Sequence, residues 1–352
     1  MGSGTRILPV VKADAYGIGV ERALAVFDRV DPWGYGVATV AEGLELRRLG
    51  VTRPVLVLMP AESEAVRDAV ERGLTLSVSS LDALEEISQE ADAQDRGLAV
   101  HVEVDTGMGR AGFDWRRAAE WGPRIAALTT RRVRWEGLYT HFHSADEADS
   151  GPTDLQRRRF RDTVEALPDA DGTERLLHLS NSAGILRRVD LEADLARPGI
   201  FLYGGSAGRD LPEPEEVVAV RARILLVREV PAGTTLGYGA TYRAARAERW
   251  ATLGIGYGDG VPRALGNQGS VVVRGRMAPI IGRISMDLTV VDITDLPEVG
   301  RGEVVTLIGT DGGARVSLEE FAEHAGTNNY EILTGLGTRL PRIWSSDGHS
   351  QE

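Results

Sequence analysis

The sequence contains no cysteine in its 352 residues. Disulfides, thiolate zinc sites and cysteine nucleophiles are therefore excluded, and covalent chemistry would have to use a lysine, a hydroxyl group or a carboxylate. No uninterrupted apolar run is long enough to cross a bilayer, and the opening residues lack the apolar segment of a signal peptide. The formal net charge of −12 offers no attraction to nucleic acid or to anionic membranes. We therefore expect a cytoplasmic protein with neither kind of partner.

Short apolar stretches alternate with longer amphipathic, charge-rich stretches through roughly the first 200 residues, a pattern typical of repeated strand-helix units. Eight such units predict an α/β fold of the TIM-like (β/α)8 barrel type. An open doubly wound sheet is the structural alternative. The expected strands are ILPVVK (7–12), YGVAT (35–39), VLVLM (55–59), LTLSV (74–78), LAVHVEVD (98–105), VRWEGLYTH (133–141), RLLHLS (175–180) and LARPGIFLYG (195–204).

The pattern changes after the proline-rich, acidic stretch LPEPEE (211–216), where short strands separated by glycine begin. This change predicts a mainly β C-terminal domain with one helix, at SLEEFAEHAG (317–326). We place the boundary close to Pro212 or Pro214, which gives domains of residues 1–212 and 213–352.

Polar residues fall where the predicted strands end. In a barrel of this type the active site forms where strand C-termini meet their loops, and phosphate is typically held after the last two strands. The residues expected at this mouth are Lys12, Arg110, His141, Asn181, Ser182, Gly199 and Ile200.

Lys12 closes the apolar run in VVKADAYGIG. It could be an ordinary solvated charge at a strand end. A lysine placed among Arg110, Arg197 and barrel walls would instead have a lowered pKa, because like charge and desolvation both disfavour the ammonium form. A neutral amine can form a Schiff base.

The stretch HLSNSAGIL (178–186) places small polar side chains at the expected start of a helix. Free N–H groups there favour an anion, although an ordinary helix N-cap explains the same residues. The nearby RPGI includes a glycine that lets backbone N–H groups approach a ligand, so a phosphate site is the favoured interpretation.

Two other strings resemble known motifs. GMGRAG (107–112) fits a dinucleotide-binding pattern, but it follows the fifth strand rather than the first and carries an arginine, which disfavours that interpretation. HFH (141–143) would put two imidazoles on one strand face and suit a metal, although further ligands are not evident. We expect His101 and His178 to be satisfied barrel residues and no metal to be bound.

Seven motifs in one order resemble the alanine racemases over nearly the whole chain. They are VVKADAYGIG, VDTGMGRAGF, EGLYTHFHSADE, HLSNSAG, ARPGIFLYG, LGIGYGDGVPR and IGRISMD. The resemblance implies homodimers that use pyridoxal 5'-phosphate, with a cofactor-binding barrel followed by a β domain. Lys12 is then expected to hold the cofactor covalently and to act as one base, with Tyr257 from the partner subunit as the second.

The resemblance also implies roles for other residues. Tyr16, Ser182 and the backbone of Gly199 and Ile200 are expected to bind the cofactor phosphate, with Asn181 nearby. Arg197 would face the pyridine nitrogen and support His141, the neighbour of Tyr257. Arg110 would bind the cofactor oxygen and the substrate carboxylate, with the backbone of the partner subunit's Met286 as second anchor and Asp287 in support.

Three positions depart from the family pattern, and one of them is Ile18, which stands where the family usually has histidine. In many relatives a lysine that carries a carbamate occupies the position of Glu103, so we expect this glutamate to replace the anion and steady Arg110. Thr338 stands where some relatives have a tyrosine at the entrance, so the pocket could be wider. The start of the chain is also shorter than usual in that family.

Four functions fit these observations to different degrees. The leading one is interconversion of L-alanine and D-alanine, a supply for peptidoglycan in a bacterium. A racemase of broader range that also takes serine is the nearest alternative. A metal-dependent barrel hydrolase that uses HFH and a non-catalytic pyridoxal phosphate carrier are the others.

Overall fold

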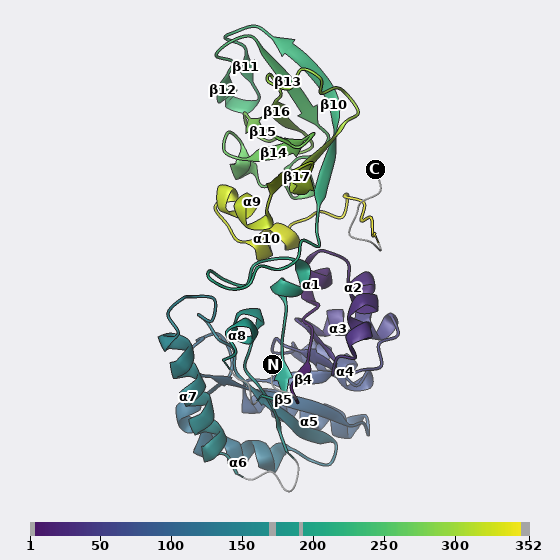
Figure 1. Ribbon diagram of the computed structural model, residues 1–352. Coiled ribbons are helices and arrows are strands. Elements are labelled where there is room, and N and C mark those ends of the chain that lie inside the picture. The colour runs from purple at the N-terminus through teal and green to yellow at the C-terminus, as the bar shows by residue number, and fades with distance from the viewer. Residues whose placement is uncertain (1–3, 169–173, 190–192, 346–352) are drawn as a thin grey trace. The chain divides into compact units, whose positions relative to one another are not determined.

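The computed structural model describes residues 4–168, 174–189 and 193–345. The chain divides into two compact units (Figure 1). The barrel unit consists of Met1–Ala15, Gly19–Phe201 and Ala207–Pro212, and the β unit of Tyr16–Ile18, Leu202–Ser206 and Glu213–Glu352. Two short segments of the first 212 residues thus belong to the β unit.

The barrel unit is built on parallel strands, as the alternating pattern predicts. Six of them form one sheet in the order β2-β3-β4-β5-β7-β8. Backbone hydrogen bonds from Asp194 and Arg197 to Leu177 and Ser180 extend the ring to β9, which pairs with β1. A parallel bridge between Val10 and Gly36 then joins the chain after β1 to β2. The strands are β1 (Arg6–Ile7), β2 (Tyr35–Val37), β3 (Val55–Val57), β4 (Thr75–Val78), β5 (Leu98–Asp105), β7 (Val133–Tyr139), β8 (Leu176–His178) and β9 (Leu195–Ala196), with β6 (Phe113–Asp114) pairing to β5.

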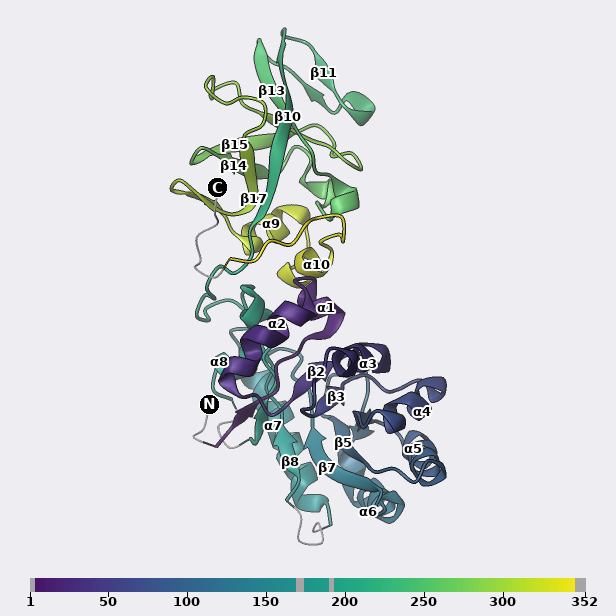
Figure 2. The ribbon, with the colours of Figure 1, turned by 90° about the vertical axis from the view of Figure 1, so that its right-hand side faces the viewer.

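Helices cover the outside of these strands, and Figure 2 shows α3 to α6 along the outer side of the curled sheet. Their starts follow from the sequence. The Thr39 hydroxyl accepts the Glu42 N–H in a capping box at α3, and the Ser80 hydroxyl accepts the Ala83 N–H at the start of α5. The helices are α2 (Val20–Phe27), α3 (Val40–Arg48), α4 (Ser63–Glu71), α5 (Leu81–Ala93), α6 (Ala118–Leu128), α7 (Gly151–Ala166) and α8 (Ser182–Leu186). The short segment α1 (Lys12–Tyr16) has left-handed backbone angles and is a turn.

The core of the barrel unit lies between the strands and these helices. Every residue of β2, β3 and β4 is buried, as expected for parallel strands that are covered on both faces. The helices contribute one apolar stripe each, for example Leu84 and Ile87 of α5. This packing fixes the strand ends, where the candidate site residues lie.

The β unit contains a mainly antiparallel sheet in the order β10-β13-β16-β15-β14-β17-β18. Because β10 also pairs with β17, six of these strands close into a ring and lack free edges. The strands are β10 (Val220–Val230), β13 (Glu248–Leu253), β14 (Ser270–Val273), β15 (Arg276–Ile281), β16 (Thr289–Asp292), β17 (Val304–Asp311) and β18 (Ala314–Val316), and β11 (Thr235–Leu236) and β12 (Tyr242–Arg243) form a separate hairpin.

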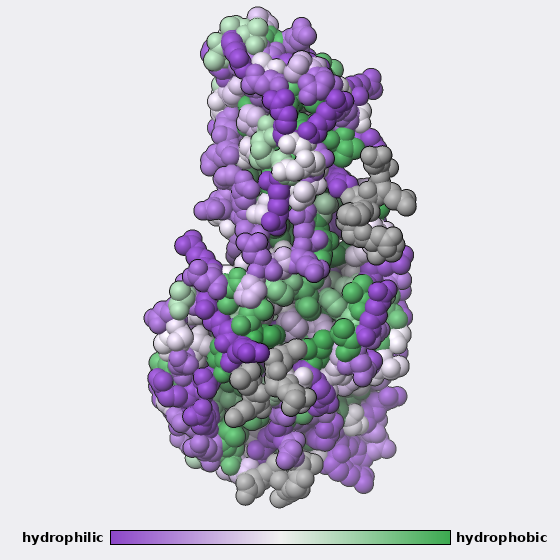
Figure 3. All heavy atoms as spheres, in the orientation of Figure 1, coloured by the Kyte–Doolittle hydropathy of each residue, from purple (hydrophilic) through white to green (hydrophobic). Residues whose placement is uncertain are grey.

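Two helices follow the sheet of the β unit: α9 (Leu318–Ala325), which was expected, and α10 (Asn329–Thr334), which was not. The side chains of Ser317 and Asn328 cap their first turns. Hydrophilic residues cover much of the face drawn in Figure 3. Across residues 4–168, 174–189 and 193–345, none of the helices is long and apolar enough to span a bilayer.

Candidate active site

Lys12 lies at the start of a turn with unusual backbone geometry. The next four residues, Ala13 to Tyr16, all have positive φ, between 52° and 56°. This left-handed conformation costs roughly 1–2 kcal/mol for each residue that carries a Cβ. Such strain persists only where the surroundings hold it in place, and it occurs mainly at functional sites.

Carboxylates hold this turn from both sides. The Glu42 carboxylate, at the start of α3, accepts the Ala13 N–H at 2.7 Å. The Asp14 carboxylate accepts the Val20 N–H at 2.7 Å, where α2 begins. The turn and the lysine on it are thus tied to two helix N-termini.

The ammonium form of Lys12 is disfavoured where it lies. The residue is exposed in the isolated chain, yet the protein around its amine lowers the pKa by desolvation, and the Arg110 charge lowers it further. The Glu42 carboxylate opposes this shift. The sequence predicts a pKa below the ordinary value for Lys12, and the structure agrees with the direction of this shift.

Arg110 is carried by the loop that follows β5. The Asp105 carboxylate accepts the N–H groups of Gly107 and Gly109 at 2.9 and 3.0 Å and folds this loop back on the strand end. Gly112 has φ +105°, and a Cβ there would lie 2.6 Å from the Asp105 nitrogen. The glycines of GMGRAG thus serve a tight loop that presents an arginine.

A buried glutamine links this loop to the one after β7. The Gln156 amide, from α7, is fully buried and donates to the Thr106 hydroxyl at 3.1 Å and to the His141 carbonyl at 2.9 Å. Its oxygen accepts the His143 N–H at 3.0 Å. Gln156 therefore fixes the two loops that carry Arg110 and His141.

Arg197 is a buried cation with a full set of acceptors. It is 3% exposed and donates to the carbonyls of Thr140 and Leu179 at 2.7 and 3.0 Å. It also donates to Nδ1 of His178 at 2.7 Å and approaches Nδ1 of His141 at 3.4 Å. The structure thus brings Arg197 and His141 together, as expected.

His141 is held as a neutral base. Burial lowers the pKa of its imidazole to about 3, aided by the positive charges of Arg197, Arg110 and Lys12. Since β7 ends at Tyr139, His141 lies in the loop beyond the strand and not on it.

Glu103 is buried within β5 and is not a surface glutamate. The Ser79 hydroxyl donates to its carboxylate at 3.1 Å. Burial raises the pKa of Glu103, while the Ser79 hydrogen bond and the charges of Arg110 and Arg197 act in the opposite direction. Its carboxylate therefore lies within electrostatic reach of both arginines.

The start of α8 contains the predicted phosphate residues. The Asn181 side-chain oxygen accepts the Gly184 N–H at 3.0 Å, so this residue caps the helix in the ordinary way. The Gly199 N–H donates to the Ser182 hydroxyl at 2.9 Å, and the 3-10 helix Ile200–Tyr203 follows. Ser182, Gly199 and Ile200 are thus adjacent.

Tyr257 and Met286 lie together in the β unit. The N–H groups of Tyr257 and Gly258 donate to the carbonyls of Ser285 and Met286 at 3.1 and 2.8 Å. The side chains of Tyr257 and Met286 are 43% and 52% exposed. Within the described residues, the Met286 N–H makes no hydrogen bond.

Asp287, beside them, pairs with an arginine that sequence reasoning did not single out. Arg339 donates to the carboxylates of Asp287 at 2.9 Å and Asp259 at 3.0 Å. Asp259 also accepts the Gly256 N–H, at 3.0 Å, and so holds the turn that carries Tyr257. Arg339 thus braces both the turn that carries Tyr257 and the turn that carries Asp287.

Tyr16 also belongs to the β unit, where its ring stacks on Tyr203 with 4.7 Å between the centroids. Burial raises the pKa of its phenol, and Tyr330 raises it further. Gly17, with φ +79°, would place a Cβ 2.3 Å from the Leu333 carbonyl oxygen. Tyr16 is therefore a neutral hydrogen-bond donor next to an obligatory glycine.

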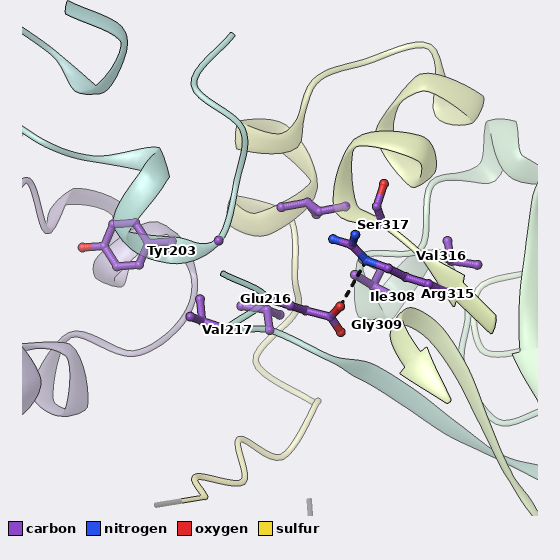
Figure 4. A pocket seen from close by; sticks show the side chains of 11 residues that line it. Tyr203, Glu216, Val217, Ile308, Gly309, Arg315, Val316 and Ser317 are labelled. Carbon is purple, nitrogen blue, oxygen red and sulfur yellow. Dashed lines mark ion pairs between the residues drawn. The ribbon is translucent and has the colours of Figure 1, made fainter. Parts of the chain in front are cut away.

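The HFH pair has separate partners, since Nδ1 of His143 lies 2.7 Å from the Ser144 hydroxyl. Among residues 4–168, 174–189 and 193–345, no group of three or more His, Asp or Glu side chains could hold a metal ion. A small cavity in the β unit, shown in Figure 4, is lined by the Glu216–Arg315 ion pair. Its volume of about 10 Å³ is room for about one water molecule and for no substrate.

Both halves of the chain match families of known proteins. The family model described as "Alanine racemase, N-terminal domain" matches residues 1–207, and "Alanine racemase, C-terminal domain" matches residues 217–344. An alanine racemase of Halothermothrix orenii is 39% identical over 352 residues, which cover 98% of this chain and 92% of the relative.

Solved structures agree with these matches. An alanine racemase from Bacillus anthracis with bound L-Ala-P has a TM-score of 0.90 at 33% identity, covering 99% of this chain and 90% of that one. One from Bartonella henselae with covalently bound pyridoxal phosphate has a TM-score of 0.87 at 30% identity, covering 97% and 93%.

The buried histidines predict how stability depends on pH. His101, His141 and His178 all have pKa values lowered by burial, so the unfolded chain binds more protons below about pH 6.5 and stability falls as pH falls. In His141→Gln, the loss of unfolding free energy between pH 6.5 and 5 should be shallower than in wild type by up to about 1.4 kcal/mol per pH unit.

Urea unfolding followed at several pH values measures this slope. His143→Gln, at an exposed position of the same loop, is the matched control for the substitution itself. An unchanged slope in His141→Gln would show that this imidazole is not held neutral by the fold.

Proposed function

This chain belongs to the alanine racemase family, and on that premise we propose that it interconverts L-alanine and D-alanine as a homodimer with pyridoxal 5'-phosphate as its cofactor. The observation that carries the proposal is the amine of Lys12. It lies in the strained turn of VVKADAYGIG with a lowered pKa beside Arg110. We expect the enzyme in the cytoplasm.

The residues of the barrel unit suit the cofactor chemically. An amine that is easily deprotonated can bind an aldehyde, and Lys12 is such an amine. Ser182 and the backbone of Gly199 and Ile200 would bind the phosphate, with Tyr16 as a further donor. Arg197, which is charged and cannot accept a proton, would face the pyridine nitrogen and keep it unprotonated. When bound, the cofactor would withdraw electrons from the substrate's Cα–H bond.

Two bases on opposite faces of the substrate account for racemisation. Nζ of Lys12 takes or returns the α-proton on one face, and Oη of the partner subunit's Tyr257 does so on the other. A 43% exposed tyrosine is available to a second chain. His141, held neutral beside Arg197, can exchange a hydrogen bond with that phenol.

The substrate carboxylate would be bound by Arg110 and by the N–H of the partner subunit's Met286. The guanidinium provides charge, and the N–H fixes orientation. Because both contacts bind the substrate carboxylate, the substrate side chain is selected only by the room that the pocket leaves for it. This favours a small amino acid. Thr338 leaves serine as a possible second substrate, so assays should include it.

Racemase activity and the identity of the reactive lysine test this proposal directly. Purified protein should interconvert the alanine enantiomers and should lose activity when sodium borohydride reduces the cofactor onto the chain. Peptide mapping should then find the cofactor on Lys12. Because Lys12 is the only lysine in the sequence, reduced protein without cofactor on this residue, or racemisation that survives in Lys12→Ala, would contradict the proposal.

The shared site predicts rescue between two inactive variants. Lys12→Ala and Tyr257→Phe chains should each be nearly inactive alone. Co-folded in equal amounts, they should recover about a quarter of wild-type activity, because half of the dimers are mixed and each has one intact site. Lys12→Ala mixed with the double variant is the control and should recover none. Equal results in both mixtures would mean that each chain builds its own site.

Glu103 is expected to steady Arg110 as an anion that belongs to the chain and needs no carbamate. Activity should therefore not respond to removal of carbon dioxide. Glu103→Gln keeps the shape but not the charge, and we expect KM for alanine to rise by about tenfold with a smaller change in kcat. Glu120, an exposed partner of Arg117, gives the matched control Glu120→Gln. An unchanged KM in Glu103→Gln would remove this role.

A further inference from the structure

A row of four polar side chains runs through the barrel unit and ends at Arg197. Glu136 of β7 is 15% exposed, while His101 of β5 and His178 of β8 are completely buried. Nε2 of His101 lies 3.4 Å from Glu136, and Nδ1 of His101 lies 2.7 Å from Nε2 of His178. Nδ1 of His178 lies 2.7 Å from Nη1 of Arg197.

Only one arrangement of protons satisfies every contact in this row. Arginine has no acceptor, so it must donate to His178 Nδ1, which places the His178 proton on Nε2. That proton is donated to His101 Nδ1, so the His101 proton is also on Nε2 and points to Glu136. The two ends of the row thus specify the same tautomer for both imidazoles.

Packing holds both rings in place. A Cβ at Gly137 would lie 2.4 Å from His101 Nδ1, so only glycine leaves room for this imidazole. The His178 ring stacks on Tyr139, with 4.7 Å between centroids and 9° between planes. The rings cannot turn to exchange their two nitrogens without disturbing the core.

The Glu136 carboxylate uses one oxygen for each of two neighbours. Oε2 accepts from His101, and Oε1 pairs with Arg134 at 2.7 Å. Burial would raise the pKa of Glu136, but His101 and Arg134 outweigh it and lower the pKa. The outer end of the row is therefore an anion.

We propose that Glu136 is a positioning residue, whose carboxylate fixes the tautomers of His101 and His178 and through them the orientation of Arg197. The proposal rests on the proposed function for its catalytic consequence, because Arg197 would face the cofactor ring there. Its structural content concerns this chain alone.

Loss of the carboxylate acts along the row because the imidazoles cannot compensate. Glutamine has a single acceptor oxygen, and Arg134 competes for it. If that oxygen turns to Arg134, an amide N–H faces the His101 N–H. Moving the His101 proton to Nδ1 removes this clash, but that proton then faces the proton on His178 Nε2. Moving the His178 proton to Nδ1 in turn places it against the Arg197 N–H. Each change of tautomer therefore moves the pair of opposed N–H groups one step closer to the guanidinium.

Imidazole ¹⁵N chemical shifts of the full chain without cofactor test the proposal before any variant is made. Both His101 and His178 should show protonated Nε2 and unprotonated Nδ1 from pH 6 to 8. A proton on Nδ1 of either ring in the wild type would overturn the proposal.

Variants of Glu136 then test the cause. In Glu136→Gln we expect at least one of the two rings to lose its single tautomer and kcat for alanine to fall by about tenfold, with a smaller change in KM. Adding Arg134→Gln should restore the tautomers and part of kcat, because the glutamine oxygen becomes available to His101. Arg134→Gln alone and Glu120→Gln should retain the wild-type shifts.

The outcomes separate the two proposals. Unchanged tautomers in folded Glu136→Gln overturn the positioning role, whether or not the wild type is a racemase. If the tautomers respond as expected but the wild type racemises no amino acid, the proposed function is wrong, while the effect of Glu136 on the two histidine tautomers still holds. If tautomers respond but kcat does not, the catalytic part of the positioning role is wrong.

Discussion

A buried guanidinium that cannot release its proton is the constraint around which the barrel interior is arranged. Arg197 requires acceptors on several sides, and the carbonyls of Thr140 and Leu179 and a neutral His178 supply them. Its charge in turn helps to lower the pKa of His141 and of His178. One permanent cation thus keeps nearby bases uncharged, as a site that moves protons needs.

A second constraint is the direction in which the chain leaves the first strand. Four consecutive left-handed residues turn it sharply after Lys12, and carboxylates on either side hold the strained backbone. Glu42 serves both this turn and the capping box of α3. The Glu42 carboxylate also partly offsets the effect of desolvation on the pKa of Lys12, so opposing effects, and not burial alone, set that pKa.

The sequence predicted the fold class well because the two patterns that indicated it, strand-helix alternation and strands separated by glycine, can each be seen within a few neighbouring residues. Apolar alternation marked all eight barrel strands, and glycine-separated strands marked the β unit. Boundaries were less accurate: the predicted first strand, 7–12, is reduced to β1 and a single bridge, because its end is recruited into the left-handed turn. The short elements β11, β12 and α10 have too few residues to produce a periodic signal.

The contacts of the candidate site were harder to predict. Family motifs indicated Lys12, Arg110, His141 and Arg197. The structure relates these residues through the contact between Arg197 and His141 and through the electrostatic effects on the pKa values of Lys12 and His141. Gln156 and Glu136 were missed, because a polar residue in an amphipathic helix or an alternating strand normally faces water. Arg339 was missed because it lies in a turn after α10, where an arginine carries no periodic signal. Only the three-dimensional arrangement shows that Gln156 is fully buried. Glu42, which holds the turn after Lys12, was also missed, although the spacing of Thr39 and Glu42 in the sequence is that of a capping box.

The central claim is that positive charge and desolvation keep the Lys12 amine uncharged more often than an ordinary lysine. The most direct measurement is the pKa of Lys12 in cofactor-free protein. Lys12 is the only lysine in the sequence, so NMR can follow it after ¹³C-methylation, and Lys12→Arg separates its signal from that of the N-terminal amine. The account predicts a pKa below the ordinary value of about 10.4, and a rise toward it in Arg110→Gln. A Lys12 pKa at or above the ordinary value, indifferent to Arg110, would contradict it.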